Sequence, residues 1–145
     1  MPILLDVDRV FLNQDYASKQ DAIRAIGEAM VSRGDVSERY VRGMLEKEEQ
    51  FSTWVTEGVA LPHGTNAVKS EIVRSSVIVV QAPKGIDWGD GKAVYLAIGL
   101  AGKGDREHLK LLSSLAAVLQ HKEKVETLKT TQDPSLVVRI LTGAE

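Results

Sequence analysis

A chain of 145 residues suits one compact domain, and no proline- or glycine-rich linker divides it, so we expect a single domain over residues 1–145. It contains no cysteine, which excludes a disulfide framework, a thiolate metal site and a cysteine nucleophile. With a net charge of −2 and no basic tract, nucleic acid is not an expected partner.

Targeting signals are not expected either. No apolar run approaches the length of about 20 residues that a membrane-spanning helix needs, so we expect no direct membrane insertion. The first residues, Met1–Asp8, include acidic side chains and no basic one, unlike the start of a signal peptide. The sequence therefore favours a cytoplasmic protein.

The N-terminal third predicts one short strand and two helices. Val10-Phe11-Leu12 is an apolar run that we interpret as the first strand. Ser18 is typical of a helix N-cap, and Gly34 marks the end of that helix. Ser37 opens a second helix, whose end, Glu46-Lys47-Glu48-Glu49, is charged and should face solvent.

The middle of the chain predicts three strands. After a loop over Gln50–Glu57, a short apolar strand, Gly58–Leu61, stops at Pro62. Two longer runs, Ser76–Val80 and Ala93–Leu100, are apolar at almost every position, which is typical of strands buried on both faces. Two glycine-containing segments between these runs are predicted to be turns: Pro83-Lys84-Gly85 and Trp88-Gly89-Asp90-Gly91.

The C-terminal third predicts three helices. Asp105 is placed to cap the first, Val125 and Leu128 indicate the second, and Asp133-Pro134 opens the last, which ends at Gly143. The order β-α-α-β-β-β-α-α-α indicates an α/β fold: a single domain with a mixed, mainly parallel β-sheet flanked by helices on both faces.

His63 is the strongest candidate for chemistry. It follows directly on a buried strand, where ligands gather in open α/β sheets. Pro62 restricts the backbone before it, and Gly64 allows a tight turn after it, so the imidazole would stand at a rigid edge. A neutral imidazole has one bare nitrogen and can accept a phosphoryl group. The alternative is a surface histidine in a turn.

His108 is the second candidate, because it lies three residues after Asp105, in the predicted first turn of a helix. The amide groups and the positive end of the helix dipole disfavour imidazolium there and favour anions. A neutral His108 could donate a hydrogen bond to a phosphoryl oxygen, although an exposed helix-end histidine is the simpler interpretation. His121 lies in a charged stretch and receives no role.

Phosphoryl transfer needs positioning and donors for the transferred oxygens. The backbone amides of Gly64 and Thr65, the Thr65 hydroxyl, His108 and one cation would suffice, and Lys47 could be that cation. No Walker loop is present, so a nucleotide is not the expected donor and no cofactor is expected. A metal held by His63, His108 and a carboxylate remains a weaker alternative, because the spacing of the two histidines is not that of a compact metal site.

One family combines these features. Glu48, Val55 and the segment Val59-Ala60-Leu61-Pro62-His63-Gly64 resemble the active-site signature of enzyme IIA domains of the mannitol/fructose type, from the bacterial phosphoenolpyruvate-dependent sugar phosphotransferase system. The resemblance runs from about Val10 to about Gly143. It includes Gln81–Gly85 and the Glu107-His108 pair that opens a helix.

The resemblance implies specific roles. The phosphoryl-accepting histidine of the family falls on His63 and its second active-site histidine on His108. Members receive the phosphoryl group from the carrier HPr and pass it to a cysteine of a IIB component. Lys47 stands where these domains usually carry an arginine, and a lysine lacks the planar fork that grips two oxygens.

The resemblance also implies a choice of branch. The segment from Val94 to Ala101 resembles the mannitol branch more than the fructose branch. A regulatory phosphoprotein of the same fold, as in the nitrogen-related branch, stays open as the alternative, because both uses need the same histidine.

Overall fold

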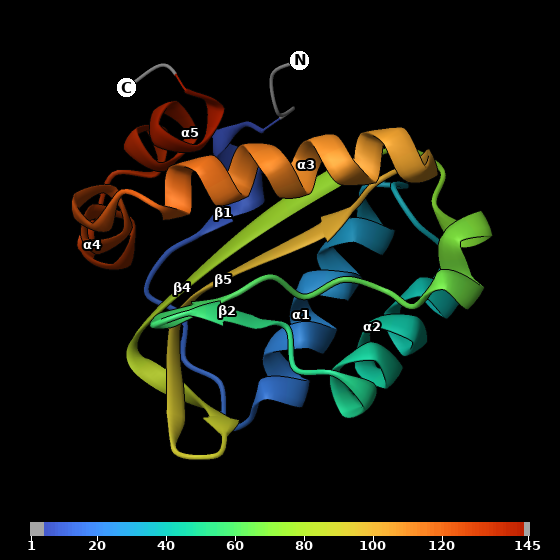
Figure 1. Ribbon diagram of the computed structural model, residues 1–145, viewed down its shortest axis with the longest axis horizontal. Helices are drawn as coiled ribbons and strands as arrows, with labels where there is room; N and C mark the ends of the chain where they lie inside the picture. The colour runs from blue at the N-terminus through green and yellow to red at the C-terminus, as the bar shows by residue number, and fades with distance from the viewer. Residues whose placement is uncertain (1–4, 144–145) are drawn as a thin grey trace.

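The two longest apolar runs form two of the three inner strands of one five-stranded sheet (Figure 1). The computed structural model describes residues 5–143. The strand order is β1-β4-β5-β3-β2. The strands are β1 (Val10–Phe11), β2 (Trp54–Thr56), β3 (Gly58–Ala60), β4 (Ser76–Gly89) and β5 (Lys92–Ala101).

The expected mixed sheet is confirmed, but its parallel share is smaller than we expected. Strand β1 pairs with β4, and β3 with β5, in the parallel direction. The pairs β4–β5 and β2–β3 are antiparallel. Half of the strand pairs are therefore parallel, because β4 returns directly into β5 through a hairpin instead of through a helix.

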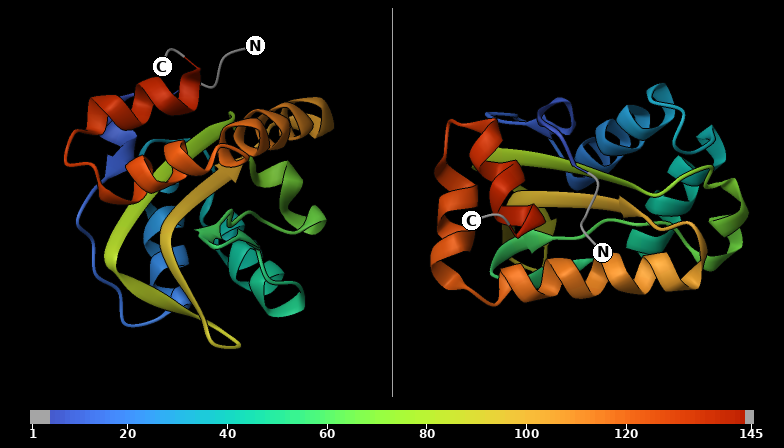
Figure 2. Two further views of the ribbon diagram at one scale, coloured as in Figure 1. Left: turned by 60° about the vertical axis from the view of Figure 1, so that its left-hand side comes forward. Right: turned by 90° about the horizontal axis from the view of Figure 1, so that it is seen from above.

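The predicted turn at Pro83–Gly85 is wrong, because β4 continues through it. The pairing with β5 jumps from Gln81–Leu96 to Ile86–Val94, which marks a bulge. Strand β1 reaches only the earlier part of β4, so the missing N–H of Pro83 breaks no ladder on that side. The true turn lies at the second predicted segment, and the hairpin extends past the other strands (Figure 2).

Five α-helices and two 3-10 helices complete the fold of the described residues. The α-helices are α1 (Lys19–Ser32), α2 (Glu38–Gln50), α3 (Gly104–Leu119), α4 (Lys122–Thr130) and α5 (Pro134–Thr142). The 3-10 helices are η1 (Val7–Arg9) and η2 (Asn66–Glu71).

The capping pattern explains where the helices begin. The Ser18 side chain accepts from the Asp21 N–H at the start of α1, and Asp133 accepts from the Ser135 N–H at the start of α5. Ser37 stands at the N-cap of α2 but makes no capping hydrogen bond with its side chain. These positions agree with the sequence signals.

Helix α3 begins earlier than predicted. Its first residue is Gly104 and its N-cap is Lys103, so Asp105 lies in the first turn and does not cap the helix. Gly104 has a φ of 83°, which glycine adopts readily, and this lets the chain enter the helix before Asp105. His108 is therefore the fifth residue of α3, just beyond the first turn where we expected it.

Each face of the sheet has its own hydrophobic core (Figure 1). Helices α1 and α2 pack on one face, with Ile23, Ile26 and Met30 fully buried. Helices α3, α4 and α5 cover the other face with a second set of aliphatic side chains. Since both faces are covered, β4 and β5 read as continuous apolar runs in the sequence.

The predicted absence of a signal peptide concerns Met1–Asp8, of which residues 1–4 lie outside the described part of the chain. Between residues 5 and 143, no helix combines the length and apolar character needed to cross a membrane.

Candidate active site

His63 stands just beyond β3, in a segment that continues along β5. The Leu100 N–H donates to the Pro62 carbonyl over 2.9 Å, which fixes this segment beside the neighbouring strand. The His63 Nδ1 lies 2.8 Å from the Leu61 carbonyl oxygen. Because a carbonyl oxygen only accepts, Nδ1 carries the proton, and Nε2 is left with a bare lone pair.

His108 lies beside His63, although the two are far apart in sequence. Their ring centroids are 5.4 Å apart and the ring planes are inclined by 55°. Both rings line one small cavity at the end of β3. The sheet and α3 together therefore bring the two predicted site histidines into one place.

Gly102 lets α3 approach the end of β5 closely. A Cβ atom at this position would lie 2.4 Å from the Cα of His108 and 2.6 Å from its backbone nitrogen. Atoms cannot approach that closely, so any side chain here would push the start of α3 away. The absence of a side chain at residue 102 thus sets the distance between the two histidines.

Both histidines are held in the neutral form. Burial is the main cause that lowers the pKa of His63; the hydrogen bond to the Leu61 carbonyl opposes it, the Lys47 charge lowers the pKa further, and Glu48 opposes weakly. Burial also lowers the pKa of His108, with His63 and the lysines of the cavity adding to the effect. A neutral His63 near pH 7 is the form that can act as a nucleophile.

Tyr40 on α2 braces the turn that follows His63. Its hydroxyl donates to the Leu100 carbonyl over 3.0 Å and accepts from the Gly64 N–H over 2.9 Å. Burial raises the pKa of Tyr40 to about 12, so the hydroxyl keeps its proton. Tyr40 ties the turn to both α2 and β5.

The backbone amide of Gly64 does not have the role that we expected, that of a donor to a phosphoryl oxygen. Its N–H is already bonded to Tyr40, so this amide is not a free donor for a phosphoryl oxygen in this structure. A Cβ atom on Gly64 would lie 2.7 Å from the Tyr40 ring and 2.9 Å from a methyl group of Val68. Gly64 is needed here because its neighbours leave no room for a side chain.

Lys47 lines the same cavity as the two histidines. It lies in the last turn of α2, and its ammonium stands 5.3 Å from the centre of the Phe51 ring. Its charge acts on both His63 and His108. The predicted cation is therefore at the site, in a position to meet a negative group.

Glu48 holds the chain that follows Lys47. Its buried carboxylate accepts hydrogen bonds from the Thr53 N–H at 3.2 Å and from the Trp88 indole N–H at 3.1 Å. Lys19 approaches the same carboxylate at 3.5 Å. Glu48, which we expected to face solvent, instead fastens the end of α2 to the β4–β5 hairpin and to α1.

Thr65 does not line the cavity, but its hydroxyl is notable. The Thr65 Oγ1 atom is buried, and no hydrogen-bond partner for it is found among residues 5–143. A buried hydroxyl without a partner costs free energy, so such groups are rare in folded proteins. The hydroxyl is adjacent to Gly64 and keeps its capacity to donate.

The sequence reasoning missed Asn66 and Lys69, which also line the cavity. Both belong to η2, in which two short 3-10 turns are joined by a kink at Val68 and no apolar period reveals them. The only available signal was that a cation follows His63 by six residues in a short segment.

Two aromatic residues, Phe51 before β2 and Trp54 within it, differ in how far they are exposed to a docking protein. Phe51 is 68% exposed beside the site. Trp54 is partly buried against the core on the α1 side, with the Lys92 ammonium 4.3 Å above its ring. Of the two, Phe51 is the one available to a docking protein.

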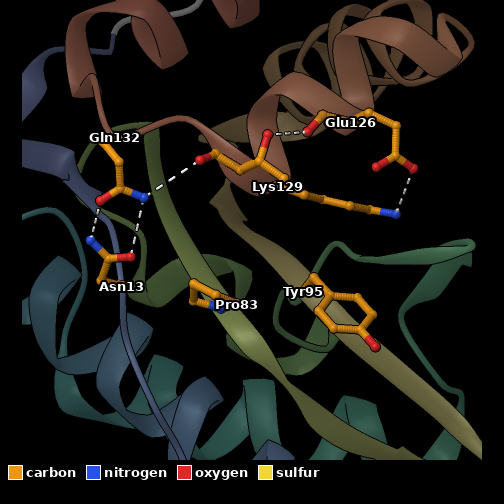
Figure 3. Close-up of a pocket in the computed structure, with 7 residues that line it drawn as sticks. Asn13, Pro83, Tyr95, Glu126, Lys129 and Gln132 are labelled. Atoms are coloured by element: carbon orange, nitrogen blue, oxygen red, sulfur yellow. Dashed lines mark hydrogen bonds and ion pairs between the residues drawn. The ribbon is translucent and has the colours of Figure 1, made fainter.

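A second cavity lies between α4 and the early part of β5 (Figure 3). Several of its polar side chains already have partners: Asn13 donates to Gln132 over 2.6 Å, and Lys129 lies 3.7 Å from Glu126. No histidine lines it. This cavity therefore offers no imidazole nucleophile.

A metal held by His63, His108 and a carboxylate was the weaker alternative from the sequence. Within residues 5–143, no group of three or more histidine, aspartate or glutamate side chains could hold a metal ion. The fold and the paired neutral histidines instead define a class of α/β protein that can carry a transferable group on an imidazole.

The chain belongs to the family described as phosphoenolpyruvate-dependent sugar phosphotransferase system, EIIA 2, whose model matches residues 3–144. A mannitol-specific phosphotransferase enzyme IIA component from Bacillus subtilis is 34% identical over 137 residues, covering 94% of this chain and 95% of the relative.

Two further proteins resemble the chain. A multiphosphoryl transfer protein from Escherichia coli O157:H7 is 39% identical over 96% of this chain, but the chain spans only 37% of that longer relative. In a solved complex of enzyme IIAMTL and phosphorylated enzyme IIBMTL from Escherichia coli, one chain matches with a TM-score of 0.90 and 32% identity, covering 96% of this chain and 97% of that one.

Proposed function

We propose that this protein is a phosphocarrier that accepts a phosphoryl group from phospho-HPr on the Nε2 atom of His63 and transfers it to a cysteine of a IIB component. The observation that carries the proposal is the hydrogen bond between His63 Nδ1 and the Leu61 carbonyl, which leaves Nε2 unprotonated. The cytoplasmic location expected from the sequence belongs to the same proposal.

The chemical step balances without a cofactor. The Nε2 lone pair forms a bond to phosphorus while the phosphorus–nitrogen bond of the donor histidine breaks, and the electron pair returns to the donor ring. Onward transfer repeats the exchange with the cysteine sulfur of the IIB component as the nucleophile. This chain has no cysteine of its own, so the thiolate has to come from the partner.

The surroundings of His63 suit the charge of a phosphoryl group. Lys47 supplies a positive charge, and neutral His108 supplies a ring N–H that can donate to an oxygen. Pre-positioned donors of this kind lower the barrier of phosphoryl transfer because little covalent work is required of the protein. The unpartnered hydroxyl of Thr65 is buried and does not line the cavity, so it could donate to a phosphoryl oxygen only after its side chain turns toward His63.

The proposed partners and substrate follow the relatives. In the matched Escherichia coli complex, enzyme IIAMTL is bound to a phosphorylated enzyme IIBMTL, which supports a IIB acceptor for this chain. The Bacillus subtilis relative is mannitol-specific, which favours mannitol as the transported sugar. The regulatory alternative of the nitrogen-related branch has less support.

Incubation with phosphoenolpyruvate, enzyme I and HPr, followed by mass mapping of the phosphorylated residue, tests the proposal. We expect one phosphoryl group on His63 and none on the His63→Ala variant. His121→Ala is the matched control, because His121 is exposed at the start of α4, away from the site. Phosphate retained on His63→Ala would end the proposal.

A further inference from the structure

A lysine of η2 completes the positive side of the cavity. Lys69 lines it together with His63, His108 and Lys47. Lys47 belongs to α2 and Lys69 to η2, so the two ammonium groups reach the histidine pair from two different elements. Two separate cations suit a group whose negative charge is spread over three oxygens.

Lys69 forms an ion pair with a carboxylate in this structure. Its ammonium lies 2.5 Å from Asp105 Oδ1, and Asp105 belongs to the first turn of α3, three residues before His108. The Lys69 side chain is 45% exposed and that of Asp105 is 81% exposed. Water screens a pair this exposed, so it can exchange easily for a stronger partner.

Phosphorylation of His63 would supply that partner. A phosphoryl group carries up to two negative charges and three acceptor oxygens, whereas Asp105 carries one charge and faces solvent. Lys47, as a point charge, is expected to meet one oxygen where an arginine fork could meet two. A second cation at the same cavity would take over the remaining contact.

We propose that Lys69 is a second phosphoryl-binding cation, which Asp105 holds while His63 is unmodified and releases when His63 carries a phosphoryl group. This inference rests on the proposed function of His63. It assigns Lys69 a direct contact with the phosphoryl oxygens, and Asp105 a positioning role. It also means that the surface beside His108 loses an ion pair and gains a free carboxylate in the phosphorylated protein.

The equilibrium of phosphoryl exchange with HPr measures this contact, because a stabilised phosphohistidine draws the group from HPr. Lys69→Met removes the cation and keeps most of the side-chain length. We expect it to lower the phosphorylated fraction at equilibrium, with the exchange constant falling by about threefold or more. Asp105→Asn removes the competing carboxylate and should raise the same constant. Lys69→Arg should stay near the unmodified protein.

Lys84→Met is the matched control. Lys84 lies in the bulge of β4 and forms an exposed ion pair with Asp15 at 3.7 Å, so this change also removes one charge and one surface pair. We expect it to leave the exchange constant unchanged. Thermal unfolding of every variant checks that the fold is kept.

A lower exchange constant for Lys69→Met together with a higher one for Asp105→Asn would support the inference. Equal exchange constants for Lys69→Met and Lys84→Met would overturn it. A lower exchange constant in both Lys69→Met and Asp105→Asn would also overturn it, because it would show that the ion pair only holds α3 in place. In either case the unmodified protein would still be labelled on His63, so the phosphocarrier proposal would survive. Failure of that labelling is a separate result.

Discussion

The Nδ1 atom of His63 donates to the carbonyl oxygen of Leu61, two residues earlier in the chain. This short local contact decides which ring nitrogen is free, because a neutral imidazole carries a single proton. It needs the segment after β3 to be bent in one particular way. Tyr40, through its bond to the Gly64 N–H, holds that bend.

Acidification should destabilise the protein through its two partly buried histidines, His63 and His108. The pKa values of His63 and His108 are lowered below the usual 6.5, so the unfolded chain binds these protons first as the pH falls. Stability is then unaffected well above pH 6.5 and falls from about 6.5 down to the lowered pKa values. The midpoint of urea unfolding should therefore drop between about pH 7.5 and 5.5.

Removing the two histidines isolates this effect. The double variant His63→Gln, His108→Gln should lose less stability over the same pH range. His121→Gln, at an exposed position, should behave like the unmodified protein. A double variant with an unchanged pH dependence would show that other groups cause the acid sensitivity.

His108→Ala should separate the two half-reactions. The variant keeps Nε2 of His63, so we expect it to accept phosphate from phospho-HPr. It loses a neutral N–H donor beside the phosphoryl group, so transfer to the IIB cysteine should slow by about tenfold to 100-fold. Rapid-quench measurement of both steps provides the check. An unchanged rate of transfer to the IIB cysteine would show that His108 has no role in that step.

Lys47→Met should weaken acceptance of the phosphoryl group by roughly tenfold or more, because a positive charge at the cavity is lost. The same change should raise the pKa of His63, since the Lys47 charge now lowers it. The pH at which acceptance is half-maximal should shift upward accordingly.

Lys47→Arg is the conservative partner of that variant. It keeps the charge and adds a second contact point, so acceptance should equal or exceed that of the unmodified protein. Loss of activity in both variants, with the fold intact, would mean that Lys47 acts through its packing on Phe51.

Tyr40→Phe should destabilise the fold by about 1–3 kcal/mol, because it leaves the Gly64 N–H and the Leu100 carbonyl without their partner. Urea unfolding measures this loss. Phosphoryl acceptance should also slow, since the turn after His63 is no longer held. Tyr95→Phe, at a partly buried tyrosine near the start of β5, serves as the control.

Gly102→Ala should displace the start of α3. The added methyl group would meet the backbone of His108 at 2.4–2.6 Å, so helix and strand must separate, at about 1–3 kcal/mol of stability. Onward transfer should fall more than acceptance from phospho-HPr, because His108 moves while His63 stays. Equal losses in both steps would contradict this division.

Local signals were sufficient for much of the fold. Ser18 and Asp133 marked two helix starts because capping is a short-range property, and Gly143 marked a helix end for the same reason. The long runs of β4 and β5 identified buried strands. Pro62-His63-Gly64 located the candidate nucleophile, since a rigid turn at a strand end can be recognised from neighbouring residues alone.

Other features were wrong or missed because they depend on distant contacts. Strand β4 continues past Pro83 because β1 is too short to pair with that part of it. Strand β2 falls in a segment predicted as a loop, since its pairing with β3 forms it. Lys69 gave only a weak signal, its position six residues after His63, because its place beside the histidines depends on how η2 packs against α3.

Short-range patterns in the chain were enough to predict the order of most elements, the burial of the central strands on both faces and the position of His63 at a strand end. These follow from hydrophobic period, turn residues and caps, which act over a few residues. Three features of the site follow only from three-dimensional packing: the ring of His108 lies 5.4 Å from that of His63, Nε2 is the free nitrogen, and Lys69 lines the same cavity. Those distances arise from packing between segments that are far apart in the chain, so no local pattern encodes them.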